Sequence, residues 1–207
     1  YEGHLMAVAD RDEQRAKVRS AMGVLVQCFD DVRAQSGDDC TVISAGGTGT
    51  FDLYDPSDPL LARVNEVQAG SYALMDSHYG ALELPFVQAL YVVGTVISVS
   101  DSWAVIDVGL KSLGMDHGNP TIEDASVWFC SDEHITFSMK DGRPLPVVGS
   151  RVLVRPAHID PTIALHEVMY VVDQIKTDET GTGKTGTDKT GTDGTVIDTW
   201  PVNLRHW

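Results

Sequence analysis

The first apolar pattern along the chain has the period of a helix. Between residues 11 and 36, apolar side chains recur at spacings of three to four among charged positions: Val18, Met22, Leu25 and Phe29. Asp10 is a suitable N-cap, and Gly37 is a suitable stop signal. The pattern therefore predicts a helix over residues 11–36.

Runs of strand character follow this helix. TVIS (41–44) leads into the glycine-rich stretch SAGGTGT (44–50), and VNEVQAGSY (64–72) is strand-like again. We expect EVQAGSYALMD (66–76) to be a half-buried strand with a polar face. Strand, helix, strand and glycine-rich loop together indicate the last units of a β/α repeat.

From about residue 88 the pattern changes to short apolar or alternating runs, separated by Gly, Pro and Asp. These runs are ALYVVGTVISVS, WAVIDVGL, SVWFC, HITFSM, RVLVRP and MYVVDQI. Such a series is typical of an all-β domain. We therefore predict two domains, residues 1–84 with the β/α units and residues 85–207 with the β-strands.

Residues 177–195 have low complexity and consist of Thr, Gly, Asp and Lys in a rough repeat, which predicts a mobile loop. The flanking runs MYVVDQI and TVIDTWPV are expected to form a hairpin with this loop at its tip. GTGKT (181–185) resembles the end of a P-loop. However, Asp178 stands where that motif needs a glycine, and neither flank fits, so ATP binding is not expected.

Composition narrows the classes of function. The 207 residues carry a net charge of −15, from 30 acidic and 15 basic residues, and they show no basic patch. A nucleic-acid partner and an anionic membrane surface are therefore both disfavoured. The three cysteines, Cys28, Cys40 and Cys130, are far apart and form no C-x-x-C motif. They fit reduced thiols in a cytoplasmic protein.

The chain shows no run of 18 apolar residues and no signal peptide, so we expect no transmembrane helix. It opens on Tyr1, and YEGHLMAVADRDEQRAKVRSAM reads as the end of a strand that enters a helix. We therefore expect this chain to be a fragment of a longer protein whose N-terminal part lies outside the sequence.

The glycine-rich turn offers groups that suit a phosphate. Its glycines, Gly46, Gly47 and Gly49, allow tight turning and expose backbone N–H groups, while Thr48 and Thr50 add hydroxyl donors. A tight βα turn without a ligand is the plainer interpretation, and the turn alone leaves both open.

RPAHIDPTIALHE (155–167) places a histidine and a carboxylate two residues apart. If His158 and Asp160 lie on a strand, both side chains point to one face and could hold a metal ion. Pro161 is expected to keep Asp160 extended. Two ordinary surface residues at a strand end are the alternative.

Two further stretches have plain structural interpretations. IDVGLKSLGMDHG (106–118) brings Asp107, Lys111 and Asp116 together, as in a surface ion pair. SDEHITF (131–137) puts Glu133 and His134 at a strand start, where a histidine is more often structural than catalytic.

The order of the motifs is more specific than any one of them. YEGH, SAGGTGTFDLY, EVQAGSYALMD, DVGLKSLGMD, SDEH and RPAHIDPTIALHE resemble, in this order, the fold-type-III pyridoxal-phosphate enzymes. More narrowly, the chain resembles the family of D-threonine aldolase, 3-hydroxy-D-aspartate aldolase and D-serine dehydratase. The resemblance runs from Tyr1 to the TWPV near residue 200.

The resemblance implies the C-terminal portion of a TIM-type β/α barrel followed by an all-β domain. It implies that Gly46, Gly47 and Thr48 hold the phosphate of pyridoxal 5′-phosphate and that Tyr1 lines the cofactor pocket. It also implies that His158 and Asp160 are the two protein ligands of a divalent metal. The Schiff-base lysine of the family precedes the start of this chain, and neither Lys17 nor Lys111 lies in a matching motif.

The implied reaction is the metal-dependent cleavage of D-3-hydroxy amino acids, D-threonine or 3-hydroxy-D-aspartate, to glycine and an aldehyde by a homodimer. A D-serine or 3-hydroxyaspartate dehydratase of the same family is the first alternative. In the family, D-serine dehydratases carry a cysteine where this chain has Asp160, and they use zinc. The aldolases carry Asp at this position, and a carboxylate beside one imidazole favours Mn²⁺, Mg²⁺ or Co²⁺ here. A non-catalytic β-rich binding module is the second alternative.

Overall fold

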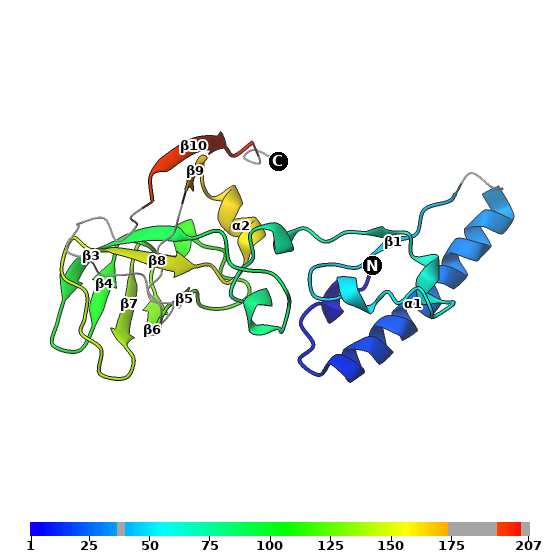
Figure 1. Cartoon of the computed structure of the whole chain (residues 1–207), viewed down its shortest axis with the longest axis horizontal. Helices are drawn as coiled ribbons and strands as arrows, with labels where there is room; N and C mark the ends of the chain where they lie inside the picture. Colours follow the sequence, from blue (N-terminus) through cyan, green and yellow to red (C-terminus); the bar gives the residue numbers. More distant parts are fainter. Residues whose placement is uncertain (37–39, 174–193, 204–207) are drawn as a thin grey trace. The chain divides into compact units, whose positions relative to one another are not determined.

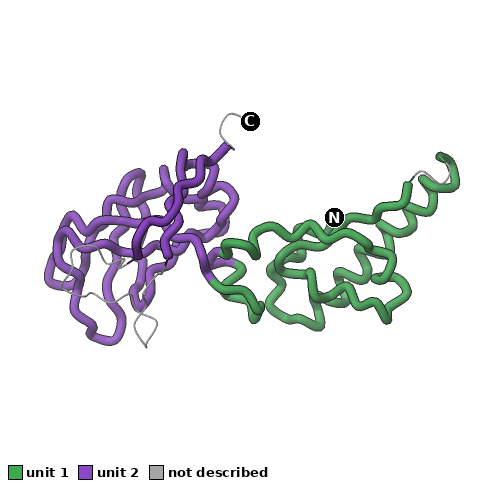
Figure 2. The backbone as a smooth tube through the Cα atoms, turned by 45° about the horizontal axis from the view of Figure 1, so that its top comes forward, with its two compact units in different colours: residues 1–75, 79–87 green, residues 76–78, 88–207 purple. Residues whose placement is uncertain are grey.

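The structure, a computed structural model, describes residues 1–36, 40–173 and 194–203 (Figure 1). The chain divides into two compact units, residues 1–75 with 79–87 and residues 76–78 with 88–207 (Figure 2). The GTGKT sequence and most of the predicted low-complexity loop lie outside the described residues. Among the described helices, none has the length and apolar character needed to cross a membrane.

The first unit is organised by α1, Arg11–Ser36, which confirms the predicted helix. Asp10 caps it, because its Oδ1 accepts the N–H groups of Asp12 at 3.0 Å and Glu13 at 2.9 Å. The predicted stop, Gly37, lies outside the described residues. The face of α1 that is buried follows an i, i+4 spacing: Gln14, Val18, Met22 and Val26.

The strands of the first unit are shorter than their sequences predict. β1, Ser44–Ala45, pairs in parallel with β2, Glu66–Val67. The strands predicted over residues 64–72 and 66–76 are wrong except at Glu66–Val67, because only these two residues pair with β1, and Ser71–Ala73 forms a 3₁₀ helix instead. Short 3₁₀ helices make up much of the rest: Gly3–Leu5, Phe51–Leu53, Leu61–Arg63, Ser71–Ala73 and Tyr79–Ala81.

One apolar core holds these pieces against α1. It consists of Leu5, Val18, Met22, Ala45, Leu53 and Leu61. The parallel pair β1–β2 beside a helix is the arrangement of a β/α unit. That this unit is a portion of a TIM-type barrel stays a prediction.

The second unit is β-rich, as the sequence predicts. Its main sheet has six antiparallel strands in the order β5-β8-β3-β4-β7-β6. The strands are β3 Val92–Val99, β4 Ala104–Ile106, β5 Thr121–Ile122, β6 Ala125–Cys130, β7 Ile135–Met139 and β8 Arg151–Arg155. Only Glu123 and Asp124 separate the two edge strands β5 and β6, so the sheet curls until it is nearly closed.

The side of the sheet that faces inward is closely packed. Ala104, Ile106 and Ile135 are completely buried, and Phe137 is 1% exposed. Further members of this core are Val96, Val108, Leu113, Ile122, Ala125 and Val154. Because side chains in a strand alternate between faces, the alternating runs of the sequence place these residues on one face.

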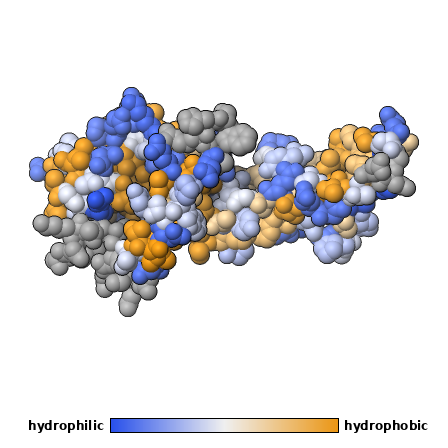
Figure 3. Space-filling model, turned by 90° about the horizontal axis from the view of Figure 1, so that it is seen from above, coloured by the Kyte–Doolittle hydropathy of each residue, from blue (hydrophilic) through white to orange (hydrophobic). Residues whose placement is uncertain are grey.

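A separate hairpin follows the sheet. β9, Val168–Val172, pairs antiparallel with β10, Val196–Pro201, which confirms the two predicted hairpin arms. Tyr170 and Ile197 of this hairpin are among the exposed large apolar residues. Hydrophobic patches also interrupt the hydrophilic surface of the face shown in Figure 3.

The prediction that Asp160 has extended geometry is wrong. His158 is extended, with φ −139° and ψ 120°, but it is the N-cap of the helix α2, Ile159–Ala164. Asp160 and Pro161 therefore lie in the first turn of α2. Proline is accepted there because the first N–H groups of a helix have no partner within the helix.

Candidate functional site

The glycine turn of the first unit is a buried structure that requires its glycines. Gly46 has φ +81°, a conformation that favours glycine. A Cβ on Gly49 would lie 1.8 Å from the carbonyl oxygen of Met6, so the two backbone segments pass too close for any side chain. A Cβ on Gly47 would lie 3.0 Å from the hydroxyl of Tyr1. The fold thus brings the hydroxyl of Tyr1 to the turn. That Tyr1 lines a cofactor pocket stays a prediction.

A buried carboxylate accepts hydrogen bonds from the glycine turn and its neighbours. Glu2, which is 1% exposed, accepts hydrogen bonds from the Tyr54 hydroxyl at 2.5 Å, the Thr50 hydroxyl at 2.8 Å and the Gly46 N–H at 3.2 Å. The Gly47 N–H donates to Thr50 Oγ1 at 3.1 Å. The N–H groups of Gly46 and Gly47, both predicted to bind phosphate, are therefore engaged by other residues of this unit.

Opposing effects set the pKa values of this network. Burial acts to raise the pKa of Glu2, but the hydrogen bonds from Tyr54, Thr50 and Gly46 outweigh it and hold the pKa below its ordinary value. Burial, and then the hydrogen bond to the negative charge of Glu2, raise the pKa of Tyr54. Glu2 is therefore an anion and Tyr54 a neutral donor at neutral pH.

Two other backbone donors of the turn remain available to a ligand. Among the described residues, none accepts a hydrogen bond from the backbone N–H of Thr48 or Gly49, although both residues are buried. The hydroxyl of Thr48 accepts the N–H of Tyr72 at 3.0 Å. Buried backbone N–H groups in native proteins almost always have a partner, so this part of the turn has the chemistry of an anion site.

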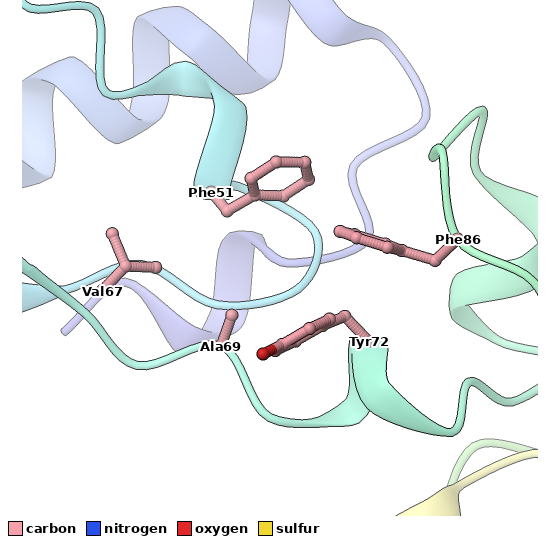
Figure 4. Close-up of a pocket in the computed structure, with 5 residues that line it drawn as sticks. All are labelled: Phe51, Val67, Ala69, Tyr72 and Phe86. Atoms are coloured by element: carbon pink, nitrogen blue, oxygen red, sulfur yellow. The ribbon is translucent and has the colours of Figure 1, made fainter.

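A hollow of about 300 Å³ lies in the same unit (Figure 4). Its lining is aromatic and aliphatic: Phe51, Val67, Ala69, Tyr72 and Phe86. The ring of Phe86 lies 5.1 Å from that of Phe51 and 5.2 Å from that of Tyr72, measured between centroids. Since Phe51 directly follows the glycine turn, apolar walls adjoin the candidate anion site.

In the second unit, the two ring nitrogens of His158 face different carboxylates. Nδ1 lies 2.6 Å from Oδ2 of Asp116, and Nε2 lies 3.4 Å from Oδ2 of Asp160. The side chain of His158 is 21% exposed, whereas those of Asp116 and Asp160 are 56% and 67% exposed. The structure thus brings the two predicted metal ligands together and adds a third group.

The backbone at His158 is tied to its surroundings. Gly114 and His158 form an isolated antiparallel bridge, and a Cβ on Gly114 would lie 2.4 Å from the ring of Pro161. Thr162 Oγ1 donates to the carbonyl of His158 at 2.6 Å and accepts the Gly114 N–H at 2.9 Å. The buried carboxylate of Asp76 accepts the Ile159 N–H at 3.0 Å. These bonds fix the start of α2 and hence the histidine.

Three imidazole rings lie next to one another in this unit, and two of them are stacked. The ring of His117 lies 4.0 Å from that of His158 with an angle of 10° between them, and 4.2 Å from that of His78. Burial, and then the charges that His158 and His78 carry when protonated, lower the pKa of His117. His117 is therefore neutral at neutral pH and covers one face of the His158 ring.

Asp116 is the ionised partner in this cluster. Burial acts to raise its pKa, but the hydrogen bond from His158 outweighs burial and holds the pKa below the ordinary value of a carboxyl. One ligand atom from each of Asp116, His117 and His158 lies within 4.8 Å of the others, a separation at which one metal ion could bind all three.

The sequence did not identify Asp116 or His117 as site residues. The surface ion pair predicted for Asp116 with Lys111 is wrong, because Lys111 pairs with Glu133 at 2.7 Å and Asp116 with His158. The adjacent carboxylate and imidazole in GMDHG were the available signal. Their role depends on a contact across 42 positions of the chain.

The chain resembles known proteins over most of its length. Residues 89–172 match the model of a family described as "Putative serine dehydratase domain". D-threonine aldolase of Arthrobacter sp is 33% identical over 180 residues, which cover 83% of this chain and 46% of that protein. 3-Hydroxy-D-aspartate aldolase of Paracoccus denitrificans (strain Pd 1222) is 31% identical over 180 residues, which cover 81% of this chain and 45% of that protein. The chain therefore spans about half the length of these relatives.

Solved structures agree with these relatives. The crystal structure of D-threonine aldolase from Filomicrobium marinum aligns with a TM-score of 0.79 at 31% identity, over 99% of this chain and 51% of that one. D-threo-3-hydroxyaspartate dehydratase from Delftia sp. HT23, at 21% identity, has a TM-score of 0.69 over 99% of this chain and 55% of its own. The second likeness shows a shared fold.

These matches place the chain in the class of fold-type-III pyridoxal-phosphate enzymes with an alanine racemase-like fold. Within this class, the chain belongs to the family that contains D-threonine aldolase, 3-hydroxy-D-aspartate aldolase and the serine dehydratase domain. The resemblance predicted from the order of the motifs is thereby confirmed.

Proposed function

We propose that the protein is a lyase that depends on pyridoxal phosphate and a divalent metal and that cleaves D-3-hydroxy amino acids to glycine and an aldehyde. The observation that carries the proposal is the approach of His158 Nε2 and Asp160 Oδ2 to 3.4 Å in the second unit. When bound, the cofactor supplies an electron sink and the metal polarises the hydroxyl of the substrate.

The donor set suits a divalent metal ion that prefers nitrogen and oxygen ligands to sulfur. An imidazole nitrogen together with carboxylate oxygens fits Mn²⁺, Mg²⁺ or Co²⁺ better than it fits a thiophilic ion. His158 and Asp160 would hold the ion between them, and the exposure of Asp160 leaves room for water and a substrate oxygen in the remaining coordination positions. The residues present therefore fit the metal that the family implies.

The glycine turn could bind a phosphate, but fewer of its backbone N–H groups are available for this than the sequence indicates. Glu2 and Thr50 engage the N–H groups of Gly46 and Gly47, so the N–H groups of Thr48 and Gly49 are the better candidates for phosphate donors. The hydroxyl of Tyr1, near Gly47, would add a donor at the same turn. The apolar hollow beside Phe51 would exclude water from the cofactor ring.

Lys17 and Lys111 are unsuited to carry the cofactor. Lys17 pairs with Glu13 at 2.6 Å and Lys111 with Glu133 at 2.7 Å, and both side chains are more than half exposed. An amine that reacts with a carbonyl needs a lowered pKa, whereas the hydrogen bond from Lys111 to Glu133 raises the pKa of Lys111. We therefore assign this role to neither residue.

The first alternative, a dehydratase, differs only in which bond of the same substrates breaks. The carboxylate at Asp160, in place of the cysteine that the resemblance associates with dehydratases, favours cleavage of the carbon–carbon bond. The alternative is a D-serine or 3-hydroxyaspartate dehydratase, and its product from D-serine would be pyruvate with ammonia.

A substrate comparison with the full-length protein tests the proposal. With pyridoxal phosphate and Mn²⁺, D-threonine should give glycine and acetaldehyde faster than D-serine gives pyruvate. EDTA should stop the reaction and Mn²⁺ should restore it. Faster release of pyruvate would replace the aldolase by the dehydratase, and absence of a cofactor absorbance band would favour the binding module.

A further inference from the structure

The two contacts of the His158 ring differ in kind. Two atoms that share a metal ion through bonds of about 2.1 Å lie roughly 3.0–3.4 Å apart when their bonds meet at 90–110°. The 3.4 Å between Nε2 and Asp160 Oδ2 meets this condition. The 2.6 Å between Nδ1 and Asp116 Oδ2 does not, because it is the length of a charge-assisted hydrogen bond.

The hydrogen bond to Asp116 selects one tautomer of a neutral imidazole. An ionised carboxylate can only accept, so the proton between Asp116 and His158 belongs to Nδ1. The lone pair of the ring then lies on Nε2, the nitrogen that faces Asp160. A metal ligand needs such a lone pair. The hydrogen bond at Nδ1 therefore leaves Nε2 in the form that can bind a metal ion.

The plane of the ring is fixed from two further sides. His117 stacks nearly parallel on the His158 ring, at 4.0 Å and 10°. The backbone of His158 is held by the bridge to Gly114 and by the hydroxyl of Thr162. Rotation of the ring that would exchange its two nitrogens must therefore break the bond to Asp116 and the stack on His117.

We propose that Asp116 is a positioning residue that sets the tautomer of His158, so that Nε2 and Asp160 bind the metal ion while Asp116 stays outside the coordination shell. This inference rests on the metal dependence of the proposed function and deepens it. Orienting carboxylates of this kind raise metal affinity, and their loss typically costs about 10–100-fold. The competing arrangement is an ion on Nδ1 with Asp116 and His117 as direct ligands.

Nitrogen NMR of the metal-free full-length protein tests the tautomer directly. Long-range ¹H–¹⁵N spectra of histidine-labelled protein at pH 8.5, with the signal of His158 assigned through its loss in His158→Gln, should show the proton on Nδ1. Asp116→Ala should shift the proton toward Nε2, whereas Asp116→Asn, whose amide oxygen still accepts, should preserve most of the wild-type pattern. A proton on Nε2 in the wild type overturns the proposal without the need for any variant.

Metal titration tests the consequence. By calorimetry, the Kd for Mn²⁺ should rise about 10–100-fold in Asp116→Ala. Asp132→Asn, a control that removes another exposed carboxylate of the same unit, should leave the Kd within about twofold of the wild type, because Asp132 approaches Lys111 and not His158. Equal affinity of Asp116→Ala and the wild type would overturn the proposal.

A spectroscopic ion separates the two arrangements. In protein loaded with ¹¹³Cd²⁺, the coupling to nitrogen should appear at Nε2 of His158. Coupling at Nδ1 would overturn the proposal in favour of direct ligation by Asp116 and His117. A wild type that binds no ion would remove the metal from the proposed function and overturn the role of Asp116 with it, whereas a failed tautomer test with normal metal binding overturns only the role of Asp116.

Discussion

The glycine turn of the first unit and the histidine cluster of the second unit hold polar groups in opposite ways. In the turn, a buried carboxylate, Glu2, binds two hydroxyls and a backbone N–H at 1% exposure. In the cluster, the side chains of Asp116 and Asp160 stay more than half exposed and approach opposite nitrogens of the His158 ring. One site is part of a core and the other lies at the surface.

Because of this difference, we expect the glycine turn to determine the stability of the first unit and the histidine cluster to determine ligand affinity. A buried polar network is costly to break, because each group left without a partner has also lost its water. Exposed carboxylates can be removed at little cost to the fold, since water replaces their partners. Substitutions in the turn should therefore unfold the first unit, whereas substitutions in the cluster should change ligand affinity alone.

The largest effect is expected at Gly49. Gly49→Ala would place a Cβ 1.8 Å from the Met6 carbonyl oxygen, a backbone atom that cannot yield without moving the chain. We expect a destabilisation of about 3 kcal/mol or more. Gly70→Ala is the matched control, because nothing lies within 4 Å of its added Cβ. Hydrogen exchange of the α1 amides in both variants measures the difference, and equal protection would contradict the close approach.

Removal of Asp160 should affect the metal and not the fold. In Asp160→Ala the loss of Mn²⁺ affinity should exceed the roughly 10–100-fold expected for an orienting carboxylate. The stability should stay within about 0.5 kcal/mol of the wild type, because the side chain is 67% exposed. Calorimetric titration and urea unfolding measure the two quantities. Unchanged Mn²⁺ affinity would remove Asp160 from the site.

A substitution of Thr48 tests whether the glycine turn both stabilises the first unit and binds the cofactor phosphate. Thr48→Val removes the hydroxyl that accepts the Tyr72 N–H, which should destabilise the first unit by about 1–2 kcal/mol. If this hydroxyl also contacts the cofactor phosphate, the affinity for pyridoxal phosphate should fall by about 1–3 kcal/mol. Cofactor absorbance titrations compared with Thr48→Ser, which keeps the hydroxyl, separate these effects. Equal cofactor affinity in both variants would exclude the Thr48 hydroxyl as a phosphate donor and leave only the backbone N–H groups of Thr48 and Gly49 in that role.

The buried carboxylate predicts an acid dependence of the first unit. The pKa of Glu2 is lower in the folded state than the ordinary glutamate value of 4.5, so its contribution to stability is present above about pH 4.5 and is lost as the pH falls through the folded pKa. In Glu2→Gln this part of the dependence should disappear. Exchange rates of α1 amides between pH 7 and pH 3 show whether the two curves differ in slope only below about pH 4.5.

The smallest effect is expected on the open side of α1. A Cβ on Gly23 meets nothing within 4 Å, and the residue lies inside the helix. Gly23→Ala should therefore stabilise α1 by up to about 1 kcal/mol through helix propensity. A destabilisation, seen as faster exchange of the neighbouring amides, would mean that this face of α1 packs against something.

Local patterns predicted a large part of the fold. The helix over residues 11–36 and its cap at Asp10 followed from spacing and from one side chain, and the strands of the second unit followed from alternation. The strand prediction over residues 64–72 was wrong for most of its length. A strand needs a neighbouring strand to pair with, and only Glu66 and Val67 pair with β1. Helical periodicity is satisfied within a segment, whereas a strand needs a neighbour.

The sequence by itself determined α1, the β-rich second unit, the hairpin arms and the His-x-Asp spacing of His158 and Asp160. Only the tertiary structure decided that Glu2 belongs to the glycine turn and Asp116 to His158, through contacts across up to 52 positions of the chain. It also decided that Asp160 lies in the first turn of a helix and not on a strand. Side-chain patterns encode local geometry, but the partner of a polar group is chosen by the folded backbone that brings distant segments within hydrogen-bond distance.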